Sequence, residues 1–320
     1  MTIDERPRKR VNVGFAYGAT DRGGSSHRDD LGATLSNGLG LDAAVEMVRW
    51  GHVVGSVAVD HSKIIADRFS VDRSGDPLGW FLGQYSARKL LSKFIPRWLF
   101  LVLHPEWPAK KLEAAWRAGV AGGLPLAADV LVYVRHSDEI LEAVIPQIEK
   151  LESRDPPRVL IGLSLGGIIL VDALSKLRAR RAVDIDLLVT VGSQSSLLYA
   201  CDALKVIRKA DEQPAIFTPW LNVWARSDFL SYPIRPTFGT FLPYQPTRTR
   251  DSYLEDVEIK TPDVFPAVHS AYFKQPLTYT AIARALIALE VLRLEDVDPR
   301  GMAVLDSVTL GAPPPTMPDV

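Results

Sequence analysis

The stretch that decides the fold is RVLIGLSLGG, residues 158–167. Its first six residues include four apolar ones, which is typical of a buried strand over 158–163. Ser164 then stands between Gly162 and Gly166, and an apolar helix is expected over 166–179. A sharp strand-to-helix turn crowds the residues two before and two after its central serine, and glycine relieves that crowding because it has no Cβ. The sequence therefore predicts that Ser164 is presented at such a turn, facing the N-terminal N–H groups of the helix.

Strand-like and helix-like stretches alternate along the rest of the chain. Strands are expected over 10–17, 52–59, 158–163, 185–192, 220–225 and 253–260, and helices over 40–51, 137–153, 166–179 and 279–293. Pro146 predicts a kink or a break in the second of these helices, because proline lacks the N–H that the helix needs. Short apolar strands that alternate with helices predict an α/β fold, with a mostly parallel central sheet and helices on both faces.

Both ends of the chain and one long internal segment depart from this alternation. Residues 1–9 form a polar tail, and the C-terminal segment 297–320 ends in GAPPPTMPDV, which is expected to lack a fixed structure. Residues 61–128 are rich in aromatic residues, and we interpret them as a cap-like insertion into a domain that spans residues 10–296. A lid of this kind would exclude water and shape a pocket, whereas an ordinary packed segment is the alternative.

Composition narrows the function classes. The formal net charge of −1 gives no support for a nucleic-acid partner, because such proteins usually carry a basic surplus. The single cysteine, Cys201, permits neither an intramolecular disulfide nor a cysteine-based metal site, and no motif calls for a metal or a cofactor. The charged start of the chain has no apolar signal region, so a cytoplasmic location is expected. The sequence makes no prediction of the oligomeric state.

One apolar stretch could contact a membrane surface. Residues 89–103 read KLLSKFIPRWLFLVL, which is too short and too interrupted by charge and proline to span a bilayer. Tryptophan and basic residues are typical of elements that lie at a lipid surface, so peripheral membrane contact through this stretch is one interpretation. A buried cap element or an ordinary packed segment is the other.

Several motifs together resemble one family. GLSLGG (162–167), VTVGSQSSLL (189–198), NVWARSD (222–228) and VHSAYF (268–273) make the chain similar to the α/β-hydrolase superfamily, particularly its lipase- and esterase-like serine hydrolases. The resemblance covers roughly residues 10–293 and is strongest from residue 158 onward. It implies the α/β-hydrolase fold and a nucleophile that is followed along the chain by an acid and then by a histidine.

This order identifies three candidate catalytic residues. Ser164 is the candidate nucleophile, and of the six histidines only His269 follows it, in a loop-like stretch before the last expected helix. Asp228 is the candidate acid because it follows the expected strand 220–225, and the carboxyl ends of such strands border the ligand crevice of α/β sheets. The alternative acids are Asp263, which ranks next, and Asp202, Asp251 and Asp256.

The resemblance also implies an oxyanion hole, a set of backbone N–H donors for the charge that develops on the substrate oxygen. One donor is the N–H of Leu165, and the second is expected from Gly18 or Ala19 in the loop Gly18-Ala19-Thr20 after the first strand. The family commonly has a His-Gly pair at this loop, whereas this chain has Tyr17-Gly18. A backbone donor needs no particular side chain, so this difference leaves activity open.

The expected function is hydrolysis of a carboxylic ester, either a small molecule or a lipid, through an acyl-enzyme on Ser164. His269 would be the base and Asp228 the acid that orients it. A thioesterase, an amidase or an acyltransferase with the same three residues is an alternative, because all of these enzymes form an acyl-enzyme. A non-catalytic binding protein of the same fold is the other alternative, and the missing His-Gly pair is the observation that favours it.

Overall fold

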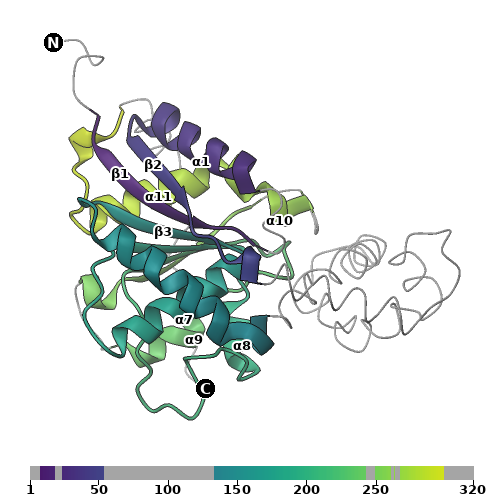
Figure 1. The fold of residues 1–320 in the computed structure, drawn as a ribbon. Helices are drawn as coiled ribbons and strands as arrows, with labels where there is room; N and C mark the ends of the chain where they lie inside the picture. Colours follow the sequence, from purple (N-terminus) through teal and green to yellow (C-terminus); the bar gives the residue numbers. More distant parts are fainter. Residues whose placement is uncertain are drawn as a thin grey trace, which may run out of the picture.

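A computed structural model describes residues 8–18, 24–53, 133–242, 249–260, 263 and 267–298. Their centre is a six-stranded sheet with the strand order β2-β1-β3-β4-β5-β6 (Figure 1). All neighbouring strands are parallel, so the chain belongs to the α/β class. The strands are β1 (Arg10–Ala16), β2 (Asp42–Met47), β3 (Arg158–Leu163), β4 (Leu187–Val191), β5 (Trp220–Trp224) and β6 (Leu254–Glu258).

Helices cover both faces of this sheet. Helices α1 (Gly24–Leu39) and α11 (Pro276–Ala288) lie on one face, and α7 (Leu165–Arg178) lies on the other with the helical residues 133–152 (Figure 1). Strand β3 is buried along its whole length and contributes alternately to the two cores. Val159 and Ile161 join the core under α1 and α11, whereas Leu160 joins the core under α7. This period of two is the geometry of a central strand that is covered on both sides.

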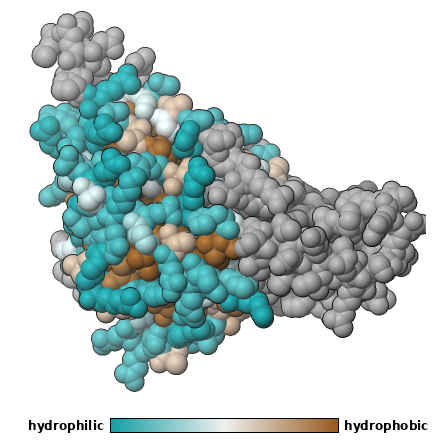
Figure 2. Space-filling model, viewed as in Figure 1, coloured by the Kyte–Doolittle hydropathy of each residue, from teal (hydrophilic) through white to brown (hydrophobic). Residues whose placement is uncertain are grey.

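The remaining elements are short. They are the helices α8 (Ser195–Ala200), α9 (Arg235–Phe238) and α10 (Ala267–Ala271), and the 3₁₀ turns η2 (Gly239–Phe241), η3 (Arg250–Ser252), η4 (Tyr272–Lys274) and η5 (Leu294–Asp296). Most of the coloured surface in Figure 2 is hydrophilic, with smaller hydrophobic areas between the polar side chains. No helix among the described residues has both the length and the hydrophobicity needed to cross a membrane.

Most of the expected elements are confirmed. The expected strands 10–17, 158–163, 185–192, 220–225 and 253–260 correspond to β1, β3, β4, β5 and β6, and the expected helices 166–179 and 279–293 correspond to α7 and α11. The expected helix 137–153 is also present, at residues 133–152, and it continues through Pro146. The predicted break there is wrong; the ring of Pro146 is exposed at the surface of the helix.

The region around residue 45 corrects the sequence analysis. The helix expected over 40–51 is wrong, because residues 42–47 form β2 and pair in parallel with β1, with Val45 opposite Val13. The apolar spacing fits a helix locally, but pairing with β1 satisfies the backbone of this segment and outweighs that preference. The strand expected over 52–59 is wrong at residues 52–53, which are helical, and residues 54–59 lie outside the described residues.

Several expectations fall outside the described part of the chain. The insertion 61–128, its stretch 89–103 and the C-terminal residues 299–320 are among the residues that the structure does not describe. The same holds for residues 1–7 of the N-terminal tail. The cap and the membrane contact therefore stay predictions.

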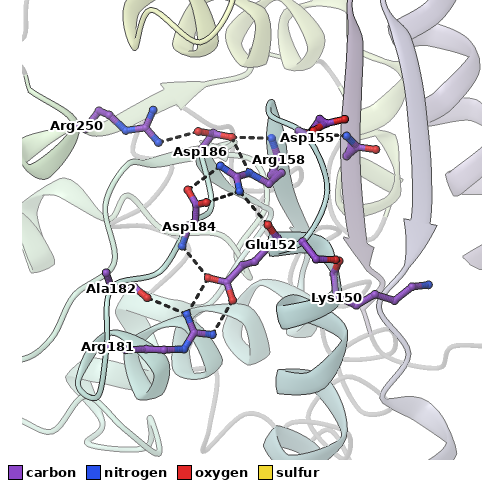
Figure 3. Close-up of polar contacts among 11 residues, drawn as sticks. Lys150, Glu152, Asp155, Arg158, Arg181, Ala182, Asp184, Asp186 and Arg250 are labelled. Atoms are coloured by element: carbon purple, nitrogen blue, oxygen red, sulfur yellow. Dashed lines mark hydrogen bonds and ion pairs between the residues drawn. The ribbon is translucent and has the colours of Figure 1, made fainter.

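Ion pairs connect the amino ends of three strands (Figure 3). Arg158 begins β3, and its backbone N–H and its guanidinium both reach the carboxylate of Asp186, at 2.8 and 3.4 Å. Arg158 also binds Asp184, and Arg250, just before β6, donates to the other oxygen of Asp186 at 2.9 Å. Since Arg158 and Asp186 are both buried, each charge is compensated by a partner at close range. This network holds the end of the sheet that lies opposite Ser164.

The close packing of Gly166 against Ala16, next to the turn at Ser164, can be tested by substitution. An ideal Cβ placed on Gly166 would lie 2.2 Å from the carbonyl oxygen of Ala16, so Gly166→Ala requires the backbone to move. We expect it to lower the free energy of unfolding by about 1–3 kcal/mol or more. Gly32→Ala is the matched control, because Gly32 lies inside α1 and its nearest contact would be an ordinary 3.5 Å from Val45.

The control is expected to raise the free energy of unfolding by about 0.5–1 kcal/mol, since alanine restricts the unfolded chain more than glycine does. Urea-unfolding midpoints of the two variants and the wild type measure the difference. Equal midpoints for Gly166→Ala and Gly32→Ala would show that the close approach at Ala16 does not exist.

Candidate active site

Ser164 lies where the order of the strands reverses. The sequence runs from β1 outward to β2 and then returns to β3 on the other side of β1, so the connections after β1 and β3 diverge. In α/β sheets such a switch point opens a crevice at the carboxyl ends of the strands, and ligands bind there. Ser164 directly follows β3, and Gly18 follows β1 by two residues. A Cβ added to Gly18 would lie 2.9 Å from the Cβ of Ser164, so the two segments meet at this point.

The backbone of Ser164 has a conformation that a residue with a side chain rarely adopts. Its φ is +54° and its ψ is −123°, and it stands at the N-cap of α7. Its N–H donates to the carbonyl of Val191 at 2.8 Å, which extends the pairing of β3 with β4. A Cβ on Gly162 would lie 2.5 Å from Gly167, so the turn closes only with glycine there. The strand–turn–helix that the sequence predicts is confirmed.

Asp228 and His269 form a buried pair. Asp228 follows β5, and its side chain has no exposed surface. His269 belongs to the short helix α10 and not to a loop, so that part of the prediction is corrected. Its Nδ1 lies 2.7 Å from Oδ2 of Asp228. Because an ionised carboxylate only accepts hydrogen bonds, Nδ1 carries the hydrogen and Nε2 is left as the basic nitrogen of the ring.

Further donors hold the carboxylate of Asp228. The backbone N–H of Leu230 donates to Oδ1 at 3.0 Å, and the hydroxyl of Tyr272 donates to Oδ2 at 2.9 Å. Burial, followed by the charge on Asp228, raises the pKa of Tyr272 well above its ordinary value. The same two causes raise the pKa of Tyr232 to about 12. Tyr272 therefore stays protonated and remains a donor, and its bond helps to compensate for the burial of the charge.

Ser164 and His269 both border the end of β4. Cε1 of His269 lies 3.4 Å from the position of a Cβ on Gly192, whose φ is +59°. Ser164 is bonded through its N–H to Val191, the residue before Gly192. Its Oγ also accepts a hydrogen bond from Nε2 of Gln194 at 3.3 Å. The serine and the histidine come from β3 and α10, which are distant in sequence, and reach the adjacent residues Val191 and Gly192 at the end of β4.

The predicted oxyanion donors are placed in part. Leu165 is the first residue of α7, and the first N–H groups of a helix have no partner within it. Its side chain is buried in the core under α7, which fixes the direction of its backbone. Gly18 lies against Ser164 as described above, whereas Ala19 and Thr20 lie outside the described residues. Both donors therefore stay predictions.

The carboxylates considered as alternatives to Asp228 are either bonded to other groups or exposed. Asp256 accepts hydrogen bonds from the side chain of Asn222 at 2.7 Å and from the backbone of Ile234 and Arg235, and burial raises its pKa. These bonds attach β6 to β5 and to the start of α9. Asp202, Asp251 and Asp263 are exposed. Asp228 is buried and has an oxygen at hydrogen-bond distance from His269, which supports it as the acid.

Two residues of the site were missed by the sequence analysis. Gln194 lies within VTVGSQSSLL and Tyr272 within VHSAYF, so both belong to stretches already singled out. A polar residue just past the carboxyl end of a central strand is a signal that could have identified Gln194. Tyr272 has no such signal, because a buried tyrosine is common in any core. Among the described residues, no group of three or more His, Cys, Asp or Glu side chains is arranged to hold a metal ion.

Comparisons with known proteins add no family to this geometry. No protein-family model, curated protein or solved structure matches the chain. Any role for Ser164, Asp228 and His269 therefore has to follow from their own arrangement.

Proposed function

We propose that this chain is a serine hydrolase that cleaves a carboxylic ester through an acyl-enzyme on Ser164. The observation that carries the proposal is the 2.7 Å bond between His269 and the buried Asp228, formed next to the turn that presents Ser164. A hydroxyl, an imidazole and a carboxylate in this relation are the elements of nucleophilic acyl transfer. The proposal includes the α/β-hydrolase fold, which the parallel sheet and the resemblance of the motifs both support.

The first half of the reaction forms the acyl-enzyme. A neutral hydroxyl is a weak nucleophile, so Nε2 of His269 takes the proton of Ser164 as its Oγ attacks the ester carbonyl. Asp228 holds the ring in the tautomer with hydrogen on Nδ1 and stabilises the imidazolium that forms. The imidazolium then gives its proton to the leaving alcohol when the carbon–oxygen bond breaks. In the second half, water attacks the acyl carbon while His269 takes one of its protons. The bond to Oγ of Ser164 then breaks, His269 returns the proton to Oγ, and the carboxylic acid is released.

The charge on the substrate oxygen needs donors of its own. The N–H of Leu165 at the start of α7 is one, and the loop that begins at Gly18 supplies the other. The positive end of the α7 dipole adds to this stabilisation. Since both donors are backbone groups, Tyr17 in place of histidine is compatible with catalysis.

The proposed substrate is a small-molecule or lipid ester. Residues 61–128 would form a cap over the site, and residues 89–103 within them would contact a lipid surface if the ester is a lipid. Hydrolysis of a thioester or an amide would use the same acyl-enzyme with a different leaving group. Transfer of the acyl group to an alcohol would use it with a different acceptor. A panel of acyl esters of graded chain length determines the preferred acyl group, and a thioester and an amide of that acyl group distinguish between the leaving groups.

Covalent labelling tests the nucleophile. A fluorophosphonate probe should label the wild type, because the activated Oγ of Ser164 attacks phosphorus and displaces fluoride. Ser164→Ala should lose all labelling. Ser153→Ala is the control, since Ser153 is exposed and follows the helical residues 133–152. Fluorescence of the labelled band, with thermal unfolding to verify the fold, gives the result.

Two outcomes would contradict the proposal. A folded wild type that never labels would favour a binding protein without catalysis. Labelling that persists in Ser164→Ala would place the reactive group elsewhere.

A second substitution tests the acid. Asp228→Asn keeps the shape of the side chain but removes the charge that selects the tautomer of His269. We expect kcat/KM for an ester to fall by about 10³–10⁴-fold, as for the acid of other serine triads. Asp263→Asn, at the exposed carboxylate that ranks second in the sequence analysis, should leave kcat/KM unchanged. A loss in Asp263→Asn together with full activity in Asp228→Asn would reverse the assignment of the acid.

A further inference from the structure

The side chain of Gln194 lies buried against the candidate nucleophile. Gln194 follows β4 at the N-cap of α8, and 4% of it is exposed. Its Nε2 lies 3.3 Å from Oγ of Ser164 and 3.5 Å from the carbonyl oxygen of Gly192. A carbonyl oxygen accepts only from a donor, so the Gly192 carbonyl fixes the amide with its nitrogen on this side.

The oxygen of the same amide has no protein partner. Oε1 of Gln194 is buried, and no hydrogen-bond donor among the described residues reaches it. A buried acceptor without a donor is unfavourable, and in native structures such a group calls for an explanation such as strain, a bound water or ion, or a catalytic role. The oxygen is only two covalent bonds away from the nitrogen that contacts Ser164. The unpartnered oxygen is therefore close to the atom at which the proposed reaction takes place.

Gln194 and the proposed base contact the same residue. His269 and Gln194 both lie next to Gly192, at the end of β4. The proposed oxyanion donors come from other elements, since Leu165 begins α7 and Gly18 follows β1. In the second half of the reaction the attacking water must contact His269, which takes its proton. A water beside His269 is therefore near the residue that Gln194 also contacts.

We propose that Oε1 of Gln194 accepts a hydrogen bond from the water that hydrolyses the acyl-enzyme, an inference that rests on the proposed function. One hydrogen of the water points to Nε2 of His269 and the other to Gln194. As the water oxygen bonds to the acyl carbon, His269 takes the first hydrogen as a proton. The bond from the carbon to Oγ of Ser164 then breaks, and His269 returns the proton to Oγ. The second hydrogen stays on the oxygen of the acid that leaves.

Two variants test this role. Gln194→Met has nearly the same length but no acceptor oxygen, whereas Gln194→Glu keeps an oxygen at that place. Gln213→Met is the matched control, because Gln213 is exposed on a loop. With p-nitrophenyl acetate, the pre-steady-state burst measures acylation and the steady rate measures deacylation. We expect deacylation to fall by about 10- to 100-fold in Gln194→Met, the size of effect that misplacement of a reactant produces, with a smaller change in acylation.

Methanol separates a role in holding water from a general structural role. Methanol has one hydroxyl hydrogen, which His269 requires, so it has none left for Gln194. In Gln194→Met the ratio of methyl ester to acid formed from the acyl-enzyme should therefore rise above the wild-type ratio. Gln194→Glu and Gln213→Met should keep ratios near that of the wild type. Thermal unfolding confirms that each variant is folded.

The outcomes distinguish this inference from the proposed function. Absence of both burst and probe labelling in the wild type would overturn both. A wild-type burst with an unchanged methanol ratio in Gln194→Met would overturn only the role of Gln194. An equal loss of acylation and deacylation in that variant would do the same, because it would mean that Gln194 merely supports the fold of the site.

Discussion

The close approach of β1, β3 and α7 at one point is the constraint on which the rest of the site depends. Gly166 packs against the carbonyl groups that end β1, and Gly162 packs against Gly167 across the turn. With the chain this compressed, Ser164 can join the strand to the helix only with a positive φ. The unfavourable backbone conformation is maintained by the packing around it. It directs the hydroxyl away from the sheet and toward the end of β4.

The two ends of the sheet use buried charge differently. At the amino end, Arg158 and Asp186 compensate each other and tie β3 to its neighbours (Figure 3). At the carboxyl end, the buried charge of Asp228 is compensated by the hydroxyl of Tyr272 and the imidazole of His269. A fixed guanidinium is suited to structure, since it never releases its proton. An imidazole is suited to proton transfer near neutral pH.

The sequence was sufficient for the features that depend on local pattern. The turn at Ser164 is encoded within ten residues, and His269 was selected as the candidate base because no other histidine follows the serine. Strand β2 was misread because its local spacing fits a helix and only pairing with β1 makes it a strand. The contacts of Gln194 and Tyr272 were missed for a similar reason, since each reaches a residue at least 30 positions away. Contacts of this kind depend on the topology of the sheet.

One short segment supplies two of the donors to Asp228. His269 lies in α10 and Tyr272 begins the 3₁₀ turn η4 directly after it, and both contact the same carboxylate oxygen. The ring of Tyr272 also lies against Gly192, so it fixes this segment beside the end of β4. A displacement of α10 would therefore remove both donors from a fully buried charge, which is far more costly than the loss of one. The burial of Asp228 thus makes its pairing with His269 and Tyr272 cooperative, because the tyrosine holds the segment that carries the histidine beside the end of β4.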